Sequence, residues 1–338
     1  MEGVLKGEIP ANARFRQHLD LCLTCRRCEE VCPNDVAYAE LAYHMRARMP
    51  KPFLRKLLEK SALHIISRPQ WLFPLLKLAE ETRPLWRRWP VLHRFAEYQP
   101  PIAKPAFASF YPGNNPQGEV MFFLGCVARV VDHDTIKSAI ALLQKHGFAV
   151  HVPLGQSCCG ALHRHLGDEA SARDLALQNM DAFVGNLPIL SVASGCAANL
   201  LDYAQFLQTP KAAAFQHRIH DAFAFLAPHL KPLQTSEKLA YHLPCTMQNV
   251  LGIDPFVTFF KGISPLAGND QCCGGAGSYM IAEPKMADLL LQDKIESIRQ
   301  SGADTVLTAN IGCMLHLQKG VRRAGLPTKI LHPLVFLA

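Results

Sequence analysis

The sequence predicts an α/β protein in which a small helical segment precedes two repeated cysteine-rich domains, each built on a parallel sheet. Three observations support this prediction. After Glu119, apolar runs of strand length alternate with helical segments, which is typical of βαβ units. The order of the cysteines in this part repeats after roughly 115 residues. The remaining four cysteines lie close together near the N-terminus.

Length and composition limit the class of protein. The chain has 338 residues, of which 49% are hydrophobic and 19% charged, enough for about two domains with a sizeable core. This excludes a disordered chain, a disulfide-stapled miniprotein and a fibrous repeat. No apolar run is long enough to span a bilayer, and the first residues lack the apolar core of a signal peptide. We therefore expect a cytoplasmic protein, whose twelve cysteines are metal ligands or redox thiols.

The N-terminal part divides into two segments. Residues 1–45 hold the clustered cysteines, between helices predicted over residues 11–20 and 37–46. Residues 46–117 form a basic linker that contains all three tryptophans, and we expect short amphipathic helices broken by four prolines: Pro69, Pro74, Pro84 and Pro90. Its end, residues 99–117, contains five prolines, which predict an irregular connection.

The rest of the chain is predicted to form one repeat over residues 118–235 and a second over residues 236–338. The first repeat has predicted strands and helices over residues 120–124, 134–146, 149–152, 168–183 and 189–193. The second has a strand, a long helix and a further strand over residues 239–242, 284–300 and 305–309.

In each repeat one cysteine is predicted to end a strand, a Cys-Cys-Gly element follows, and another cysteine is predicted to end a further strand. The cysteines of the first repeat are Cys126, Cys158, Cys159 and Cys196, and those of the second are Cys245, Cys272, Cys273 and Cys313. The intervals are 31 and 36 residues in the first repeat and 26 and 39 in the second. With the N-terminal four, this pattern includes every cysteine of the chain.

The N-terminal cysteines have the spacing of a bacterial ferredoxin. They spell C-x2-C-x2-C-x3-C-P, a tight loop that turns thiolates toward one [4Fe–4S] cluster; they are Cys22, Cys25, Cys28 and Cys32. A zinc site is the alternative, although zinc ligands are usually split into two distant pairs. In two-cluster ferredoxins the fourth cysteine ligates the other cluster. Cys32 is therefore either the fourth ligand of the same cluster or a ligand of a second cluster. In the second case another cysteine run of this kind would lie upstream or on a partner chain.

The two Cys-Cys-Gly elements point to metal binding. Adjacent cysteines form a strained disulfide, whereas two neighbouring thiolates can bind neighbouring iron atoms. The glycine lets the backbone approach closely and direct N–H groups at sulfur. Cysteines at strand ends lie where an open α/β sheet forms its binding crevice. A buried structural cysteine pair is the alternative.

This arrangement resembles the cysteine-rich CCG domain of the heterodisulfide reductase family. In the fullest form of that family each repeat ends in C-x-x-C and holds a non-cubane [4Fe–4S] cluster. Here Asn199 and His316 stand at the position of the last cysteine. The resemblance therefore implies either a four-cysteine cluster in each repeat or an altered site with His316 as a further ligand.

The whole layout resembles the iron–sulfur subunit of glycolate oxidase (glycolate dehydrogenase). The similarity is carried by LCLTCRRC at residues 21–28, QCCGGAG at 271–277 and TANIGC at 308–313. It implies an electron-transfer subunit that takes electrons from FAD-containing subunits, which oxidise glycolate to glyoxylate, and passes them to a quinone or another respiratory carrier. Related subunits serve lactate utilisation. Because this family normally has two ferredoxin runs, we expect an N-terminally shortened chain or a lineage that lost one cluster.

No catalytic residue is assigned to this chain. The glycines after Cys273 do not spell G-x-G-x-x-G after a strand, so we expect no flavin or nicotinamide on it. Two other functions remain open. One is a thiol/disulfide oxidoreductase, in which a cluster of the repeats cleaves a substrate disulfide, and the other is a non-enzymatic zinc scaffold.

The positive charge of the chain is concentrated in one segment. Residues 44–94 hold twelve Lys and Arg against three Asp and Glu, within a net charge of +7 for the chain. This segment is either a solvated helical face, a docking surface for the flavin subunits, or a peripheral contact with the cytoplasmic face of the inner membrane. Nucleic acid is not expected as a partner, because no recognition motif accompanies the charge.

Overall fold

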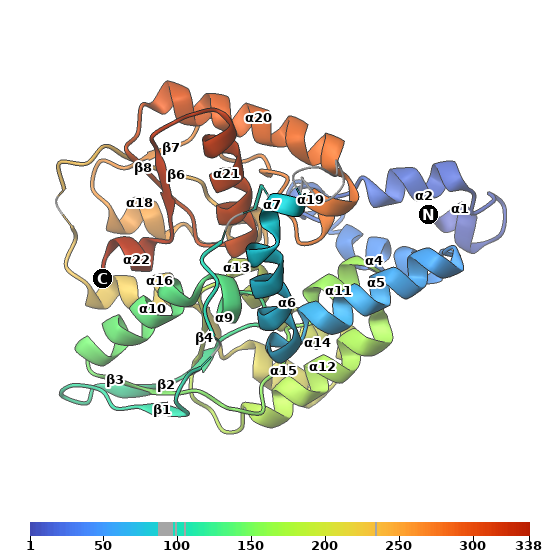
Figure 1. Ribbon diagram of the computed structural model, residues 1–338. Helices are drawn as coiled ribbons and strands as arrows, with labels where there is room; N and C mark the ends of the chain where they lie inside the picture. Colours follow the sequence, from blue (N-terminus) through green and yellow to red (C-terminus); the bar gives the residue numbers. More distant parts are fainter. Residues whose placement is uncertain (87–96, 99, 105, 234) are drawn as a thin grey trace.

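The computed structural model describes residues 1–86, 97–98, 100–104, 106–233 and 235–338 (Figure 1). Its centre consists of two sheets. The first has the order β1-β3-β2-β4-β5, with strands Phe110–Tyr111, Phe148–His151, Gly118–Phe123, Ile189–Ser191 and Ile219–Asp221. The second has the order β7-β6-β8-β9, with strands Ser264–Pro265, Leu239–Tyr241, Thr305–Leu307 and Lys329–Leu331.

The two sheets have the same topology. Neighbouring strands are parallel except for β1, which pairs antiparallel with β3 at the edge of the first sheet. When β1 is left out, the strand orders are β3-β2-β4-β5 and β7-β6-β8-β9. In each sheet the first strand of the repeat, β2 or β6, lies in second place, and the other strands occupy corresponding places. This confirms the predicted fold class of two repeated α/β units with parallel sheets.

Helices connect the strands of each unit. Those of the first are α9 to α16 and a 3₁₀ turn: Ala128–Val131, His133–Lys145, Ala161–His165, Glu169–Ala182, Ser194–Leu201, Tyr203–Leu207, Pro210–Gln216, Ala222–Leu226 and Ala227–His229. Those of the second are α17 to α22: Cys245–Asn249, Pro255–Phe259, Tyr279–Ala282, Pro284–Ser301, Ile311–Arg323 and Pro333–Phe336. Side chains cap several of these helices; Asp168, for example, accepts a hydrogen bond from the backbone N–H of Ser171 at the start of α12.

Seven helices form the N-terminal part within the described residues. They are α1 to α7: Glu2–Leu5, Ala13–Asp20, Arg27–Glu30, Tyr38–Arg48, Phe53–Ile66, Pro69–Glu81 and Arg83–Trp86. The structure corrects one expectation, because Pro74 lies inside α6 and does not end it. Pro69 occupies the first turn of α6, where a missing N–H is tolerated. Pro90 lies outside the described residues. No helix in these ranges is both long and apolar enough to cross a membrane.

The proline-rich stretch before the first repeat is partly ordered into the sheet. Residues Phe110–Tyr111 form β1 and pair with Val150 and His151 of β3. The sequence analysis treated this stretch as an irregular connection. A two-residue strand leaves no periodic pattern, so the pairing could not be read from the sequence.

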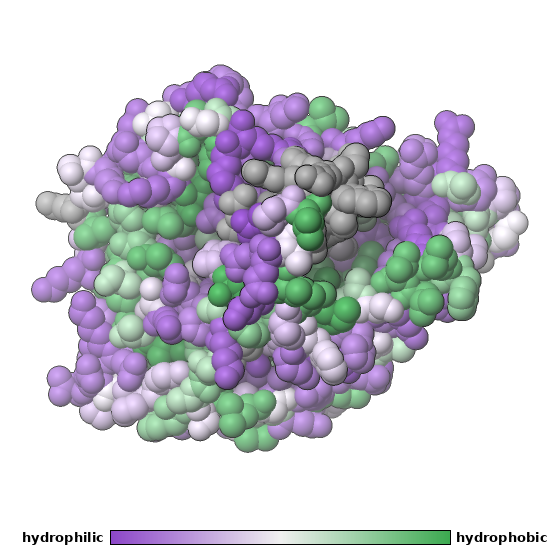
Figure 2. All heavy atoms as spheres, in the orientation of Figure 1, coloured by the Kyte–Doolittle hydropathy of each residue, from purple (hydrophilic) through white to green (hydrophobic). Residues whose placement is uncertain are grey.

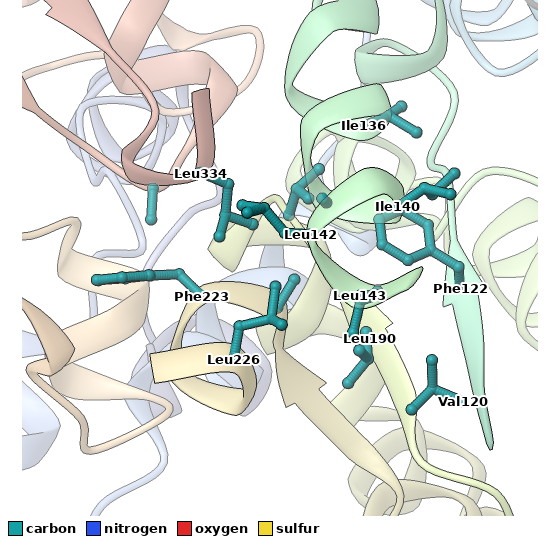
Figure 3. Close-up of a cluster of buried hydrophobic side chains, with 14 of the residues drawn as sticks. Val120, Phe122, Ile136, Ile140, Leu142, Leu143, Leu190, Phe223, Leu226 and Leu334 are labelled. Atoms are coloured by element: carbon teal, nitrogen blue, oxygen red, sulfur yellow. The ribbon is translucent and has the colours of Figure 1, made fainter. Parts of the chain in front are cut away.

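The two repeats share one hydrophobic core. Val120 and Phe122 of β2 and Leu190 of β4 are fully buried, and the same cluster contains Leu307 of β8 and Leu334 of α22 (Figure 3). Hydrogen bonds also cross between the repeats, from the Ser194 N–H to the Ala309 carbonyl at 3.1 Å and from His332 Nε2 to the Val192 carbonyl at 3.0 Å. The repeats are therefore packed as a single body.

A buried arginine connects the N-terminal helices to the first repeat. The Arg164 side chain of α11 is 3% exposed and forms ion pairs with Glu40 of α4 and, at 3.0 Å, with Asp202. Its guanidinium also lies 4.4 Å from the ring centre of Tyr43 and 4.5 Å from that of Phe206. This contact fixes α4 against the repeat.

Candidate metal centres

The carboxyl edge of each sheet gathers the cysteines of its repeat. Cys126 follows β2, and Cys245 begins α17 just after β6. Cys196 and Cys313 do not end strands as expected but lie in the first turns of α13 and α21, which follow β4 and β8. We call the group of Cys126, Cys158, Cys159 and Cys196 site 1, and the group of Cys245, Cys272, Cys273 and Cys313 site 2.

Site 1 is a buried group of thiols. The Sγ atoms of Cys126 and Cys158 are 3.2 Å apart, and the Gly160 N–H donates to Cys158 Sγ at 3.5 Å. Hydrogen bonds from Cys158 and Cys196 lower the pKa of the Cys159 thiol well below its usual value. Contact with Cys126, contact with Cys159 and burial raise the pKa of Cys158. The Cys159 thiol therefore lies between two further thiols of the group, those of Cys158 and Cys196.

Side chains from distant elements hold the backbone of the first Cys-Cys pair. Asn199 donates through Nδ2 to the Cys159 carbonyl at 2.6 Å, and the Tyr203 hydroxyl donates to the same carbonyl at 2.8 Å. Asn179 donates to the Cys158 carbonyl at 2.9 Å. Asn199 thus holds the backbone of Cys159, whereas the heterodisulfide reductase family in its fullest form has a cysteine at this position.

Site 2 repeats this arrangement with a wider spacing. Cys245 Sγ and Cys272 Sγ are 4.0 Å apart, and the Gly274 N–H donates to Cys272 Sγ at 3.5 Å. Asn310 donates through Nδ2 to Cys313 Sγ at 3.4 Å. Cys273 is fully buried, and its Sγ lies within 4.8 Å of both Cys313 Sγ and a ring nitrogen of His242. Both repeats therefore place neighbouring thiols side by side after the strands of their sheet.

Two histidines lie near site 2, and they differ in their partners. His316 is buried, with Nε2 3.2 Å from the Ala287 carbonyl and Nδ1 3.2 Å from the Tyr98 hydroxyl. Both of its nitrogens thus have protein partners. His242 is 1% exposed, neither of its nitrogens has a partner, and burial lowers its pKa to about 3. The sequence analysis missed His242, although its place three residues before Cys245 was a signal.

A buried lysine gives site 2 a positive charge. Lys294 of α20 is 2% exposed and its Nζ donates to the Gly268 carbonyl. Burial lowers the pKa of Lys294, while the charges of Cys273 and Cys272 oppose this effect. Lys294 could not be predicted as part of the site, because it lies within a long amphipathic helix.

Substituting Lys294 should change the electronic properties of a metal centre at site 2. Lys294→Met removes a buried cation that stabilises additional negative charge, so we expect the reduction potential of this centre to fall by on the order of 50–100 mV. Redox titration followed by electron paramagnetic resonance (EPR) measures the shift. Lys285→Met, on the exposed first turn of the same helix, is the control and should leave the potential unchanged. An unchanged potential in Lys294→Met would contradict the electrostatic role.

The N-terminal cysteine loop lies beside site 2. Burial raises the pKa of Cys25, and the nearby thiolates of Cys245 and Cys22 add to this effect. Burial also raises the pKa of Cys28, which the charges of Cys22 and Cys25 raise further. Cys22, Cys25 and Cys28 are thus close enough to affect one another electrostatically. Cys32 follows α3 and is held by backbone hydrogen bonds with Glu29 and Asp35.

Three contacts fix this loop on the second repeat. Asn249 donates to the Cys25 carbonyl at 2.8 Å, and the Tyr279 hydroxyl donates to the Leu21 carbonyl at 3.0 Å. Arg27 forms an ion pair with Asp270. The sequence separates these partners by more than two hundred residues, so only the fold could reveal the contact.

The glycine of the second Cys-Cys-Gly element tolerates no side chain. Gly274 has φ +83°, and an added Cβ would lie 2.8 Å from the Ala287 carbonyl oxygen. Gly160, its counterpart in the first repeat, has φ +89°, but the equivalent contact with the Ala172 carbonyl is 3.4 Å. Both glycines adopt a left-handed conformation, and only Gly274 also faces a steric clash.

We expect Gly274→Ala to reduce the free energy of unfolding by about 2–4 kcal/mol. The strain of a left-handed alanine and the clash of its Cβ with the Ala287 carbonyl both contribute to this loss. Gly160→Ala should reduce it by about 1–2 kcal/mol, since only the strain applies. Urea unfolding of the metal-free variants measures both. Equal losses would contradict the steric difference between the two positions.

Two sheets of equal topology, each with four thiols at its carboxyl edge, define a cysteine-rich α/β protein whose repeats can hold metal centres. Residues 120–201 and 239–318 match the family model described as CCG, cysteine-rich domain. These two segments of the chain are similar to that family.

Relatives extend the similarity over nearly the whole chain. A protein of Bacillus subtilis (strain 168) described as probable glycolate oxidase iron-sulfur subunit is 29% identical over 98% of this chain and 83% of the relative. The glycolate oxidase iron-sulfur subunit of Escherichia coli (strain K12) is 27% identical over 94% of this chain and 82% of the relative. These relatives confirm the resemblance found in the motifs.

The fold is also similar to that of a solved structure. A hypothetical protein from Helicobacter pylori matches 96% of this chain with a TM-score of 0.55 and 11% sequence identity. This chain covers 64% of that protein, so the solved chain is considerably longer. At this level of identity the similarity concerns the fold alone.

Proposed function

We propose that this chain is the iron–sulfur electron-transfer subunit of a flavin-dependent 2-hydroxyacid dehydrogenase complex. In this proposal, FAD-containing partner subunits oxidise glycolate to glyoxylate, and the chain passes the electrons to a quinone or another respiratory acceptor. The observation that carries the proposal is the grouping of the twelve cysteines: site 1, site 2 and the loop that contacts site 2 through Asn249 and Tyr279. The named relatives support glycolate as the substrate of the complex.

The residues present fit iron–sulfur clusters. Sites 1 and 2 combine neighbouring thiols with backbone N–H groups that donate to sulfur, as at Gly160 and Gly274. When bound, [4Fe–4S] clusters supply transfer of single electrons. The chain's own residues exclude water by burying Cys158, Cys159 and Cys273, and Lys294 adds a positive charge at site 2. We assign the ferredoxin-type centre to Cys22, Cys25, Cys28 and Cys32, and the other two to sites 1 and 2.

The exposed faces of α5 and α6 suit contact with a partner. Large apolar side chains on these helices are exposed: Phe53, Leu54, Leu57 and Leu58 on α5, and Trp71, Leu75 and Leu78 on α6. Figure 2 shows apolar spheres gathered over α5. The same segment of the sequence, residues 44–94, is rich in Lys and Arg. We propose that this face docks on the flavin subunits or on the cytoplasmic face of the inner membrane.

Metal analysis tests the cofactor. We expect the chain purified without oxygen to contain iron and acid-labile sulfide in equal amounts and to show EPR signals after reduction. Zinc without sulfide, even after reconstitution with iron and sulfide, would contradict the electron-transfer function.

Reconstitution with flavoprotein subunits tests the role of the chain. We expect no glycolate oxidation by this chain alone, and reduction of its centres by glycolate only when the flavin subunits are present. Turnover of glycolate by the isolated chain would overturn the assignment of substrate oxidation to the partner.

A further inference from the structure

His242 is an unpaired polar side chain in the interior of the protein. Its side chain is 1% exposed, and both Nδ1 and Nε2 are buried without a hydrogen-bond partner. Among the residues that the structure describes, it is the one histidine with both nitrogens in this state. A buried polar group without a partner costs about 1–3 kcal/mol, so an imidazole held in this way points to a group not formed by the protein.

The position of the ring indicates what this group is. One ring nitrogen of His242 and the Sγ atoms of Cys273 and Cys313 all lie within 4.8 Å of one another. Ligands at about 2.0–2.3 Å from one metal ion are separated by less than twice that distance. The limit of 4.8 Å on the three separations is only slightly above this range, so one metal centre can reach all three atoms, and both cysteines already belong to site 2.

The first repeat provides an internal comparison. Phe123 stands three residues before Cys126, as His242 stands three residues before Cys245. Phe123 is buried and packs on Phe183 with ring centres 5.9 Å apart. Site 1 therefore has a hydrocarbon ring at the position where site 2 has an imidazole. The other nearby histidine, His316, already uses both nitrogens in bonds with Ala287 and Tyr98.

We propose that His242 is a ligand of the metal centre at site 2, bound through one ring nitrogen beside the thiolates of Cys273 and Cys313. The inference rests on the proposed function in that site 2 holds an iron–sulfur cluster. Site 1 is then an all-thiolate centre and site 2 a mixed thiolate–imidazole centre. Imidazole ligation raises the reduction potential of iron–sulfur centres, so site 2 is the more easily reduced of the two.

Nitrogen-sensitive pulsed EPR tests this ligand. The full chain is labelled with ¹⁵N-histidine, and Cys159→Ser is introduced to remove the centre at site 1. We expect a strongly coupled ¹⁵N nucleus on the reduced centre of site 2. The coupling should disappear in His242→Phe, which introduces the residue that the first repeat has at this position. It should persist in His316→Gln, the matched control.

A second variant covers the case in which His242→Phe does not fold. His242→Cys keeps a metal ligand, so we expect iron at site 2 to be retained, the nitrogen coupling to be lost and the reduction potential to fall. A site 2 centre without strong nitrogen coupling in the unaltered labelled chain would overturn the inference and leave the proposed function intact. Absence of iron and sulfide from site 2 would instead refute the proposed function.

Discussion

Replacing Cys159 with serine is expected to abolish the metal centre at site 1 while site 2 and the N-terminal centre remain. Cys159 is buried and lies between Cys158 and Cys196, whose hydrogen bonds lower the pKa of its thiol. A serine hydroxyl stays protonated there and binds iron poorly. If the three centres are of equal size, iron per chain falls by about one third. Iron analysis and EPR after oxygen-free purification measure the loss.

The neighbouring serine provides a control for this substitution. Ser157 lies two residues away, and its hydroxyl donates to the Leu175 carbonyl at 3.3 Å. Ser157→Ala removes a polar group of the same loop without removing a thiol, and it should keep its full iron content. Full iron and an unchanged spectrum in Cys159→Ser would exclude Cys159 as a ligand.

Replacing Arg164 with methionine should reduce the free energy of unfolding by about 3–5 kcal/mol, the range for removing one partner of a buried ion pair. The substitution removes the cation that pairs with the carboxylates of Glu40 and Asp202. Both carboxylates stay largely buried near site 1. It also removes the contacts of the guanidinium with Tyr43 and Phe206. Because Glu40 belongs to α4, the N-terminal helices should detach more readily from the first repeat.

Urea unfolding and limited proteolysis measure the effect of Arg164→Met. The control is Lys211→Met, which removes an ion pair with Asp181 whose side chains are 60% and 72% exposed. This exposed pair should contribute no more than about 1 kcal/mol. Similar losses in the two variants, or protease resistance of residues 1–45 in Arg164→Met, would contradict the proposed role of Arg164.

The sequence predicted the central strands of both sheets but not their edges. The apolar runs at residues 120–124 and 305–309 correspond to β2 and β8 because a strand buried on both faces is continuously hydrophobic. The edge strands β1, β5, β7 and β9 have two or three residues, and each contains at least one exposed residue. Such strands have too few residues for a pattern, and β7 includes a proline, which is tolerated at an edge.

The cysteines of the candidate centres were predictable because their spacing is local or repeated. His242 and Lys294 were not, because their proximity to Cys273 results from packing of β6 and α20 around the same sheet edge. The contact of the N-terminal loop with Asn249 was also beyond the sequence pattern. His316 was named from its spacing, and the structure adds the two partners that its ring already has.

The common hydrophobic core of the two repeats has a consequence for symmetry. In a dimer of identical subunits, any change of residue would alter both centres at once. Here both halves belong to one polypeptide and pack around the same interior, so each centre can be changed independently while the distance between them stays fixed. Phe123 and His242 occupy matching positions in the two halves and are different residues, so they are one example of such an independent change.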